Sequence, residues 1–270
     1  MKLCRFEPRE LAAKHPGRTA REVHEQSGAG ILEDSLIREI SGELWGERRP
    51  TGRQWRLDEV RLLPPSWPSK IICVGRNYAA HNKEMDSDTP KEPVIFSKPP
   101  SSIIAPGDPI VLPRISNRVD HEGELGVVIG RRFARPRADQ DLRPCIAGYT
   151  CLNDVTARDL QRIDVQFTRS KGFDTFCPFG PVLETEAPPP QTTVETFVNG
   201  QQRQTGRVAD MIFSVDFVLR WIAEAMTLEP GDLIATGTPS GVGPLHPGDV
   251  VEIRISGIGS LRNPVVGPQD

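Results

Sequence analysis

Residues 119–130, VDHEGELGVVIG, carry three acidic side chains at alternate positions. Successive side chains of a β-strand point to opposite faces, so Asp120, Glu122 and Glu124 are predicted to share one face. The Cα atoms of the two glutamates then lie about 6.5 Å apart, which lets both side chains reach one ion. Without a cation, like charges held so close resist joint ionisation. The strand alone indicates either a cation site or a solvated acidic edge.

A further carboxylate lies in CLNDVTARD, residues 151–159. Asp154 follows the apolar run CIAGYTCL and precedes a predicted short helix, a position that suits a site on a rigid scaffold. Three oxygen ligands without a nearby Cys or His pair favour Mg²⁺ or Mn²⁺ over zinc, and Ca²⁺ could take the same place in a crystal. Asp159 is an alternative third ligand, but it is predicted on an exposed helical turn. We therefore predict a metal site formed by Glu122, Glu124 and Asp154.

A histidine and a glutamate lie three positions apart in VGRNYAAHNKEM, residues 74–85. On a helix, His81 and Glu84 would share one face. A carboxylate beside an imidazole raises its basicity and fixes its tautomer, as a water-activating base requires. The same pair also fits an ordinary surface histidine beside a surface glutamate. The polar, proline-bounded sequence NKEMDSDTPKEP that follows is typical of a mobile loop that closes over a site, so we expect residues 76–92 to be mobile in the absence of ligand.

Two further stretches could contact a substrate. Lys171, in RSKGFDTFCPFGP, would neutralise a carboxylate or a developing enolate if it pointed at the metal, and would otherwise face solvent. In IATGTPSGVG, the backbone amide of Gly237 and the hydroxyl of Thr238 could hold a carboxylate, although a Gly-Thr-Pro turn is a weak signal. The predicted substrate contacts are Arg76, Gln161, Lys171, Gly237 and Thr238.

Short apolar runs bounded by Gly and Pro dominate the chain after residue 65 and predict many strands. Three turns, APGDPI, EPGDLI and HPGDVV, share a Pro-Gly pair that suits a type II turn and leads into an apolar strand. Tight turns into strands favour a sheet-based roll over alternating strands and helices. The predicted fold class is therefore α+β and β-rich, a mixed β-sandwich roll preceded by a small N-terminal α/β domain.

One long helix is predicted in the segment SVDFVLRWIAEAM, residues 214–226. Ser214 is expected to cap it. Its predicted apolar side consists of Phe217, Leu219, Trp221, Ile222 and Met226. A shorter helix is expected in VTARDLQRID, after Asp154.

The chain is predicted to divide near a proline-rich joint, LLPPSWPSK at residues 62–70. Residues 1–65 form the expected small domain, with short strands such as KLCRF. Residues 66–270 form the expected catalytic domain, which contains every candidate site residue.

Composition narrows the class of protein. The 270-residue chain carries 33 Lys and Arg against 36 Asp and Glu, a formal net charge of −3, and no basic block argues for nucleic acid. It has no apolar run of the ~20 residues that cross a bilayer, and its start lacks the apolar segment of a secretory signal. Its five cysteines include no C-x-x-C pair, so we expect reduced thiols and a cytoplasmic protein.

Taken in order, these motifs resemble the fumarylacetoacetate hydrolase family. The matching pieces are GRNYAAHNKE, FSKPPSSI, DHEGELGVVIG, NDVTARDLQ, RSKGFDTFCPFGP, VNG and LEPGDLIATGTPSGVG. The resemblance runs from about residue 68 to the C-terminus, and the first 65 residues look like the small N-terminal domain of many shorter members. It implies a β-rich roll that forms a homodimer. It also implies a divalent cation held by three carboxylates, which here are Glu122, Glu124 and Asp154.

The same resemblance implies roles for other residues. His81 and Glu84 would form a dyad on a lid, and Lys171 would be the lysine that offsets charge on an enolate. Asp120 matches a family position and is expected to lie next to the metal ligands without binding the metal itself. His121 stands where members usually carry an aromatic residue such as tyrosine. Strand parity points His121 away from the metal, so we expect it to pack.

The implied activity is hydrolysis of a C–C bond in a small acylpyruvate-like 1,3-diketo acid, as in an acylpyruvase of aromatic catabolism. His81 would take a proton from water, and the hydroxide would attack the distal carbonyl. The alternatives are decarboxylation or tautomerisation of oxaloacetate-like or hydroxyheptadienedioate-like keto acids, and hydrolysis or dehydration of keto-deoxy sugar acids. A non-catalytic metal-binding member is a further alternative. The expected partner is a small keto-acid substrate, with no nucleic acid and no membrane.

Overall fold

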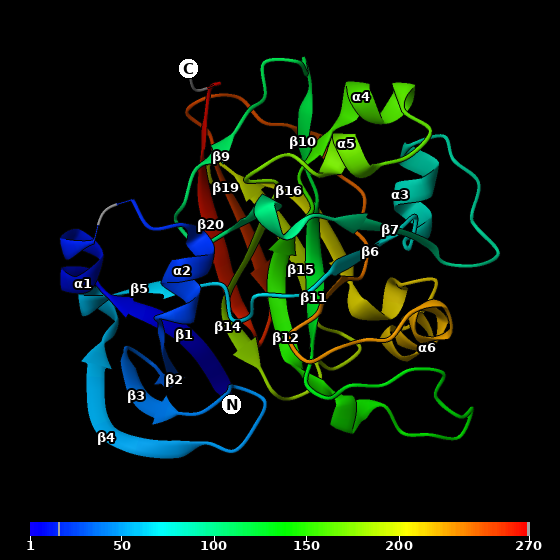
Figure 1. Cartoon of the computed structure of the whole chain (residues 1–270). Coiled ribbons are helices and arrows are strands. Elements are labelled where there is room, and N and C mark those ends of the chain that lie inside the picture. The colour runs from blue at the N-terminus through cyan, green and yellow to red at the C-terminus, as the bar shows by residue number, and fades with distance from the viewer. Residues whose placement is uncertain (16, 269–270) are drawn as a thin grey trace.

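The computed structural model describes residues 1–15 and 17–268. A twelve-stranded mixed sheet runs through the molecule in the order β4-β3-β2-β1-β14-β12-β11-β17-β6-β7, with β5 and β8 paired to β1 and β14 (Figure 1). Its strands are β1 Lys2–Pro8, β2 Gly28–Glu33, β3 Leu36–Ser41, β4 Arg49–Arg56, β5 Val60–Leu63, β6 Ile71–Gly75, β7 Val94–Lys98, β8 Ile103–Ile104, β11 Gly123–Ile129, β12 Ile146–Asn153, β14 Cys177–Glu184 and β17 Leu233–Ala235.

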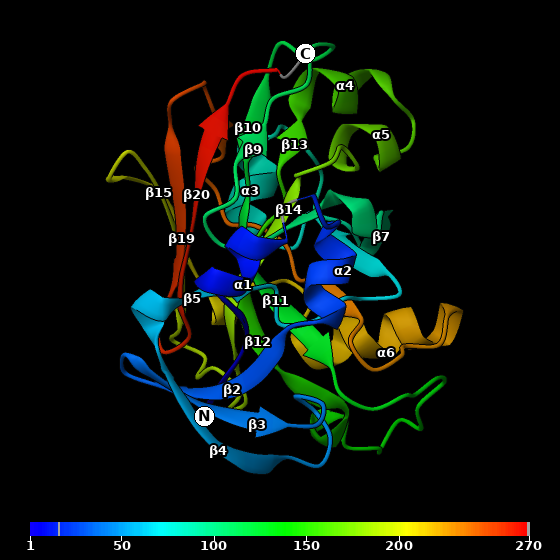
Figure 2. The same ribbon diagram turned by 60° about the vertical axis from the view of Figure 1, so that its left-hand side comes forward.

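A five-stranded sheet packs against this sheet and forms a second layer. Its order is β16-β15-β19-β20-β9, and Figure 2 shows β19 and β20 as a layer beside β11 and β12. Its strands are β9 Ile110–Val111, β15 Thr193–Val198, β16 Gln201–Arg207, β19 Val250–Ile255 and β20 Gly259–Val266. A small third sheet contains β10 Val119–His121, β13 Thr156–Ala157 and β18 Gly243–Pro244. The predicted β-rich sandwich is confirmed.

Helices are short and lie outside these layers. The α-helices are α1 Arg9–Lys14, α2 Ala20–Glu25, α3 Ala79–Glu84, α4 Arg158–Ile163, α5 Thr168–Lys171 and α6 Val215–Ala225. Single 3₁₀ turns are η1 Leu57–Glu59, η2 Pro100–Ser102, η3 Arg143–Cys145 and η4 Val208–Asp210. The helix expected after Asp154 begins only at Arg158, because Thr156 and Ala157 extend and pair with β10. No helix in the described ranges is both long and apolar enough to cross a bilayer.

The first 65 residues join the rest of the molecule through a shared sheet. β1 pairs with β2 and β5 of the N-terminal region, and it also pairs with β14, with Leu3 opposite Leu183. The N-terminal region contains α1 and α2 as well as strands, and Thr19 caps α2 by accepting a hydrogen bond from the Glu22 amide. Leu3 is fully buried, so the junction between the two regions is part of the core.

The predicted turns are found as expected. Gly107, Gly231 and Gly248 have φ angles of 86°, 88° and 93°, the left-handed values that a type II turn requires. These turns lead into β9, β17 and β19 respectively. A side chain other than glycine would be strained at these positions, so the Pro-Gly pairs set where the three strands begin.

Helix α6 follows the prediction in length but not in its buried side. Ser214 caps it, accepting a hydrogen bond from the Phe217 amide. The buried side consists of Val218, Leu219, Ile222 and Ala223. The prediction that Phe217 packs inward is wrong, since 46% of Phe217 is exposed. Phe217 instead stacks between the rings of Phe213 and Trp221, with centroid distances of 5.5 and 6.5 Å, along the helix surface.

Candidate metal centre and active site

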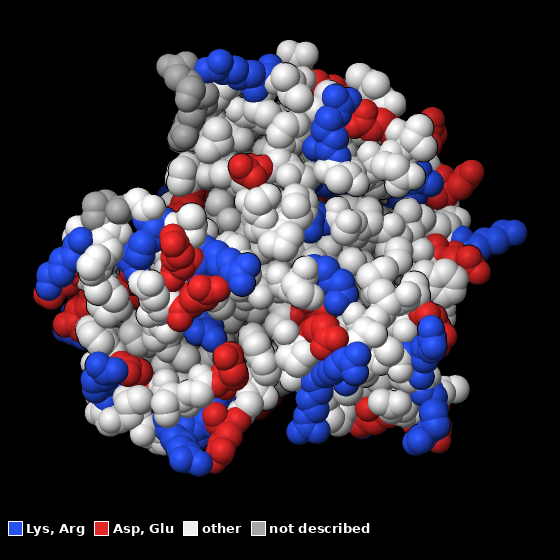
Figure 3. Space-filling model, in the orientation of Figure 1, with Lys and Arg blue, Asp and Glu red and all other residues white. Residues whose placement is uncertain are grey.

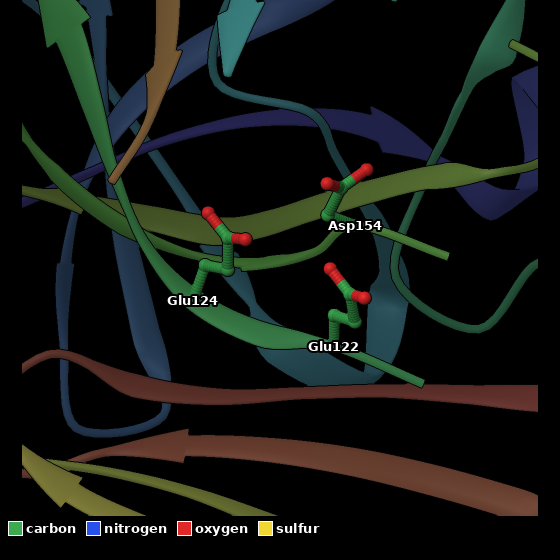
Figure 4. Close-up of side chains that lie close together, drawn as sticks. All are labelled: Glu122, Glu124 and Asp154. Atoms are coloured by element: carbon green, nitrogen blue, oxygen red, sulfur yellow. The ribbon is translucent and has the colours of Figure 1, made fainter. Parts of the chain in front are cut away.

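Two neighbouring strands bring the three predicted metal ligands together. Glu122 lies between β10 and β11, Glu124 lies on β11, and Asp154 directly follows β12. β11 and β12 are antiparallel neighbours, and the Asp154 amide donates a 2.8 Å hydrogen bond to the Glu122 carbonyl. One carboxylate oxygen from each side chain lies within 4.8 Å of the other two, and the side chains converge (Figure 4). These three residues therefore form one group that could hold a metal ion.

All three carboxylates are buried, each residue being at most 4% exposed. The alternative interpretation of this stretch, a solvated acidic edge, is therefore wrong. Asp120 is buried as well, but its carboxylate accepts hydrogen bonds from Arg118 and Arg158 and stands apart from the group. Asp159, the alternative third ligand, accepts hydrogen bonds from the loop at residues 116–117. Both acids are thus occupied by the protein itself.

Two buried lysines partly compensate the carboxylates. Lys171 Nζ donates hydrogen bonds to Glu122 Oε2 at 2.8 Å, to Asp154 Oδ2 at 2.6 Å and to Thr156 Oγ1 at 2.8 Å. Lys98 Nζ donates to Asp154 Oδ1 at 2.6 Å. Lys171 was expected to neutralise a carboxylate if its side chain pointed at the metal site. The side chain does point there. Lys98 was not predicted.

Arg158 is a second residue of the site that was not predicted from the sequence. Its guanidinium binds Asp120 Oδ2 at 2.9 Å, Glu122 Oε1 at 2.5 Å and Gln161 Oε1 at 2.6 Å. In the sequence, Lys98 ends the apolar run VIFSK, and Arg158 lies four residues after Asp154. Both stand within motifs already quoted. Neither position reveals that the side chain turns inward, because Lys and Arg side chains usually face water.

The charges around the group are unevenly distributed. Burial would raise the pKa of Glu122, but Lys171 and Arg158 outweigh it and hold that pKa well below its usual range. Burial, reinforced by Asp154 and Glu122, raises the pKa of Glu124 well above its usual range. For Lys171, the nearby carboxylates outweigh burial and raise the pKa, which keeps the amine charged. Glu124 is therefore the ligand whose ionisation most needs an added cation.

The loop after β17 holds Glu124 and its neighbour Gly123 through hydrogen bonds. The Gly237 amide donates a 2.7 Å hydrogen bond to Glu124 Oε2, and the Thr238 hydroxyl donates to the Gly123 carbonyl at 2.9 Å. The Gly237 amide thus orients a predicted ligand in this structure, and its expected contact with substrate stays a prediction. Gln204 Nε2 in turn donates to Thr238 Oγ1 at 2.7 Å.

His121 lies on the other side of this loop. It is buried, does not line the active-site cavity, and its Nδ1 lies 3.1 Å from Gln204 Oε1. Burial lowers the pKa of His121. The side chain therefore packs away from the three carboxylates as a neutral imidazole. Its hydrogen bond to Gln204 is a polar contact that the alternation of side chains along the strand did not indicate.

The predicted dyad is formed on α3. His81 Nδ1 lies 3.2 Å from Glu84 Oε2, and the Gly241 amide donates to both oxygens of Glu84 at 3.0 and 3.1 Å. His81 is buried, which excludes the ordinary surface pair as its description. With Nδ1–H donated to Glu84, the Nε2 lone pair is free to accept a proton. The expected mobility of residues 76–92 stays a prediction.

A cavity of about 90 Å³ connects the dyad with the three carboxylates. Of the predicted residues, those that line it are Arg76, His81, Glu122, Glu124, Asp154, Gln161, Lys171 and Thr238. Glu84 and Gly237 do not line it and act through His81 and Glu124. One small chamber thus holds a candidate base, a charged lysine and a candidate metal site.

A second, wider cavity of about 510 Å³ adjoins this chamber, and the two share the lining residues Arg76, Met85, Ser87, Arg158, Gln161 and Phe167. Its four arginines are Arg76, Arg118, Arg158 and Arg162. Glu84 and Asp86 also line it, so basic residues outnumber acidic ones. Elsewhere, on the face shown in Figure 3, acidic and basic side chains alternate without a large patch of one sign. Arg118 and Arg158 are paired with Asp120 and Glu122, so Arg76 and Arg162 are the arginines best placed to hold an anion in the outer cavity.

Comparison with known proteins assigns the two parts of the chain. Residues 70–266 match the C-terminal fumarylacetoacetate hydrolase domain, and residues 1–65 match the N-terminal domain described as Rv2993c-like. The chain is 44% identical over 226 residues to the oxaloacetate tautomerase YisK of Bacillus subtilis, covering 78% of this chain and 75% of that protein.

Solved structures agree with this assignment. A 5-carboxymethyl-2-hydroxymuconate delta-isomerase from Mycobacterium smegmatis has a TM-score of 0.86 and 43% identity, covering 99% of this chain and all of that one. A maleylpyruvate hydrolase from Sphingobium sp. SYK-6, solved with manganese(II) and pyruvate, has a TM-score of 0.78 and 28% identity, with both chains fully covered. The fold, the sequence matches and the cluster of buried acids agree with one another. The chain belongs to the fumarylacetoacetate hydrolase family.

Proposed function

We propose that this protein binds a small 2-oxo dicarboxylic acid beside a divalent cation and interconverts its keto and enol forms. The observation that carries the proposal is the continuity of two cavities. The inner one joins three buried carboxylates to His81, and the outer one is lined by four arginines. A substrate with an anionic group at each end fits both. Relatives that act as an oxaloacetate tautomerase and a hydroxymuconate isomerase support this class of reaction.

The residues present fit an oxygen-preferring cation. Glu122, Glu124 and Asp154 offer carboxylate oxygens within 4.8 Å of one another, without a sulfur or imidazole ligand among them. Such a donor set suits Mg²⁺ or Mn²⁺, and a neighbour of the same fold was solved with manganese. A bound divalent cation would hold the carboxylate and keto oxygens of the substrate and acidify the adjacent C–H by polarising the carbonyl.

His81 is the proposed proton carrier. Glu84 fixes its tautomer through the 3.2 Å contact at Nδ1, which leaves Nε2 to take a proton from the carbon next to the carbonyl and return it to oxygen or carbon. Lys171 is held charged between Glu122 and Asp154 and offsets negative charge that develops on the substrate. In the metal-free protein the nearby carboxylates outweigh burial and raise the pKa of Lys171, which favours the protonated amine, so His81 is the proposed base.

The arginines of the outer cavity are proposed to bind the second carboxylate of the substrate. Arg76 lines both cavities and is exposed at the mouth, so it is the best placed of the four to contact both ends of a diacid. Arg158 is already paired with Asp120 and Glu122, which makes it a support for the metal site. A guanidinium binds a carboxylate through two parallel hydrogen bonds, which selects diacids over monoacids.

Hydrolysis of a C–C bond in an acylpyruvate-like acid is the second candidate. Two observations favour it: the His81–Glu84 dyad has the arrangement that activates water, and one neighbour of the same fold is a maleylpyruvate hydrolase. Both candidates pass through an enolate of a 2-oxo acid. They differ in whether His81 takes its proton from carbon or from water.

The experiment compares purified protein with Mg²⁺ or Mn²⁺ on enol-oxaloacetate, a 5-carboxymethyl-2-hydroxymuconate and an acylpyruvate. We expect kcat/KM for tautomerisation to exceed that for cleavage by about tenfold or more. Arg76→Gln should raise KM for the diacids while leaving turnover of a monocarboxylic 2-oxo acid unchanged. Glu124→Gln protein, prepared identically, controls for contaminating enzymes. Faster cleavage of the acylpyruvate would replace tautomerisation by the second candidate.

A further inference from the structure

A separate cavity of about 200 Å³ lies between the N-terminal region and the rest of the chain. Its walls come from α2, from β5 with the turn after it, and from β8 with the turn after it. Figure 1 shows α2 and β5 on the side of the molecule where the N-terminal strands continue the twelve-stranded sheet. The cavity shares no lining residue with the active-site chamber. Its contents are therefore independent of the function proposed above.

Most of the wall is apolar. Val23 of α2, Leu63 of β5, Trp67 and the β8 residues Ile103 and Ile104 line it. Apolar cavities of ~150 Å³ in proteins are large enough to bind benzene. This cavity is larger, so its volume suits a single ring that carries one small substituent.

One end of the cavity is cationic. Arg61 donates through Nη2 to both oxygens of Asp108, at 2.5 and 2.7 Å, and its Nε and Nη1 make no hydrogen bond within residues 1–15 and 17–268. Arg18 also lines the cavity and is paired with Glu7 outside it. Both lining arginines are ion-paired, so an anion in the cavity would be held by the donors of Arg61 that Asp108 leaves unused. A guanidinium with unused donors is a good partner for a carboxylate.

A buried histidine gives a second, independent sign of an incomplete site. His24 lines the cavity, is 8% exposed, and its Nε2 has no hydrogen-bond partner in the described part of the chain. Its ring is tilted against Trp67 at a centroid distance of 5.9 Å. Buried polar atoms in native proteins are nearly always paired, so an unpaired nitrogen here marks a place where a polar group of a ligand would be accommodated.

We propose that this cavity binds a small monocarboxylic acid with an apolar ring. The ring lies against Trp67 and Ile104, and the carboxylate meets Arg61. The Rv2993c-like N-terminal region supplies α2 and β5, so the site exists only where that region and the catalytic part are joined.

Benzoate is the probe, titrated calorimetrically into Mg²⁺-loaded full-length protein whose active site is saturated with oxalate. We expect one benzoate per chain. Val23→Trp fills the cavity and should weaken binding about tenfold or more. Arg61→Gln removes the charge and should weaken binding about fivefold or more, and neutral benzamide should bind wild type more weakly by a similar factor. Glu25→Trp places the same ring on the exposed side of α2 and should leave binding unchanged.

Oxalate binding and the thermal midpoint report whether each variant folds. If Val23→Trp does not fold, Arg61→Gln and the benzoate–benzamide pair decide the matter. Absence of benzoate binding at millimolar concentration would overturn the proposal, as would equal binding of benzoate by wild type and both cavity variants. Equal affinity for benzamide and benzoate would overturn the assignment of a carboxylate.

Discussion

Lys98 Nζ lies 2.6 Å from Asp154 Oδ1, and both side chains are almost completely excluded from water. Asp154 thereby has two lysine partners, since Lys171 binds its other oxygen. Glu122 is paired with Lys171 and Arg158. Glu124 forms no ion pair with a described residue and is held by the Gly237 amide. The protein thus neutralises two of the proposed ligands itself and leaves the third for a cation.

Lys98→Met should destabilise the metal-free protein by roughly 3–5 kcal/mol, because it removes one partner of a buried carboxylate and leaves Asp154 with only Lys171, which Glu122 shares. The loss should be smaller in Mg²⁺, and Mg²⁺ should bind more tightly, because one positive charge has left the site. Urea denaturation with and without Mg²⁺ measures both effects. Arg21→Met breaks an exposed pair with Glu25 and should change little. Equal stability of Lys98→Met and wild type would contradict the role given to this lysine.

Glu124→Gln should weaken Mg²⁺ binding by about tenfold or more, since a carboxamide is a poorer ligand than a carboxylate. A carboxyl must lose its proton to bind a metal. Because burial and the neighbouring acids raise the pKa of Glu124, wild-type affinity should fall as pH falls and metal binding should release a proton. Calorimetry in buffers of different ionisation enthalpy detects that proton. Unchanged affinity in the variant would place the ion elsewhere.

His81→Ala should lower kcat by roughly 10²- to 10⁴-fold, the usual contribution of a positioned base. Mg²⁺ affinity should be retained, because His81 is not a proposed ligand. Glu84→Gln should have a smaller effect, since it disturbs the orientation of the imidazole without deleting it. Steady-state kinetics together with calorimetry separate these effects. Wild-type turnover by His81→Ala would remove the dyad from the mechanism.

Gln204→Leu should destabilise the fold by roughly 3 kcal/mol or more, because several buried polar groups lose their partner at once. Gln204 Oε1 accepts from the Gly123 amide and the Thr196 hydroxyl, and Nε2 donates to Thr238. The matched control, Gln202→Leu, changes an exposed residue of the same strand and should have a small effect. Chemical denaturation measures both. Equal effects of the two substitutions would show that the buried contacts contribute little.

His24 should make stability fall with acid. Burial lowers the pKa of His24 to about 3, against 6.5 for the free side chain. Between these values the unfolded chain binds the proton and the folded chain does not, so stability rises with pH in this window. From pH 7 to pH 5 this group should cost about 2 kcal/mol, at ~1.4 kcal/mol per unit. Denaturation of wild type and His24→Gln at both pH values isolates the contribution of His24 to the pH dependence of stability. An identical pH dependence in the two proteins would contradict it.

Local sequence was sufficient for features that depend on neighbours along the chain. The alternation placed Glu124 on a strand as predicted, with Glu122 at the break between β10 and β11, and Asp154 followed its apolar run to the strand end. Ser214 began α6 as predicted, because an N-cap hydrogen bond spans only three residues. In the same way, the Pro-Gly pairs located three turns, since positive φ is a property of the glycine itself.

Burial could not be inferred in this way. The helical pattern placed Phe217 on the inner side, yet it stacks along the surface, because which face of α6 is covered depends on the strands beneath it. The same limit applies to the acidic stretch, whose sequence fits a solvated edge as well as a buried group. The surrounding layers of the fold decide whether the acids are exposed or buried. Burial and the neighbouring charges then set the pKa of each acid.

The partners of the acids required the complete fold. Lys98 and Asp154 are 56 residues apart, and Gln204 reaches the Gly123 amide across 81 residues. Their contacts depend on the order and register of strands that are far apart in the sequence. Each is settled by the summed packing of many side chains, and no short stretch of sequence contains that information. The acids of this site can therefore be recognised in the sequence, whereas the charges that balance them emerge only when the chain has folded.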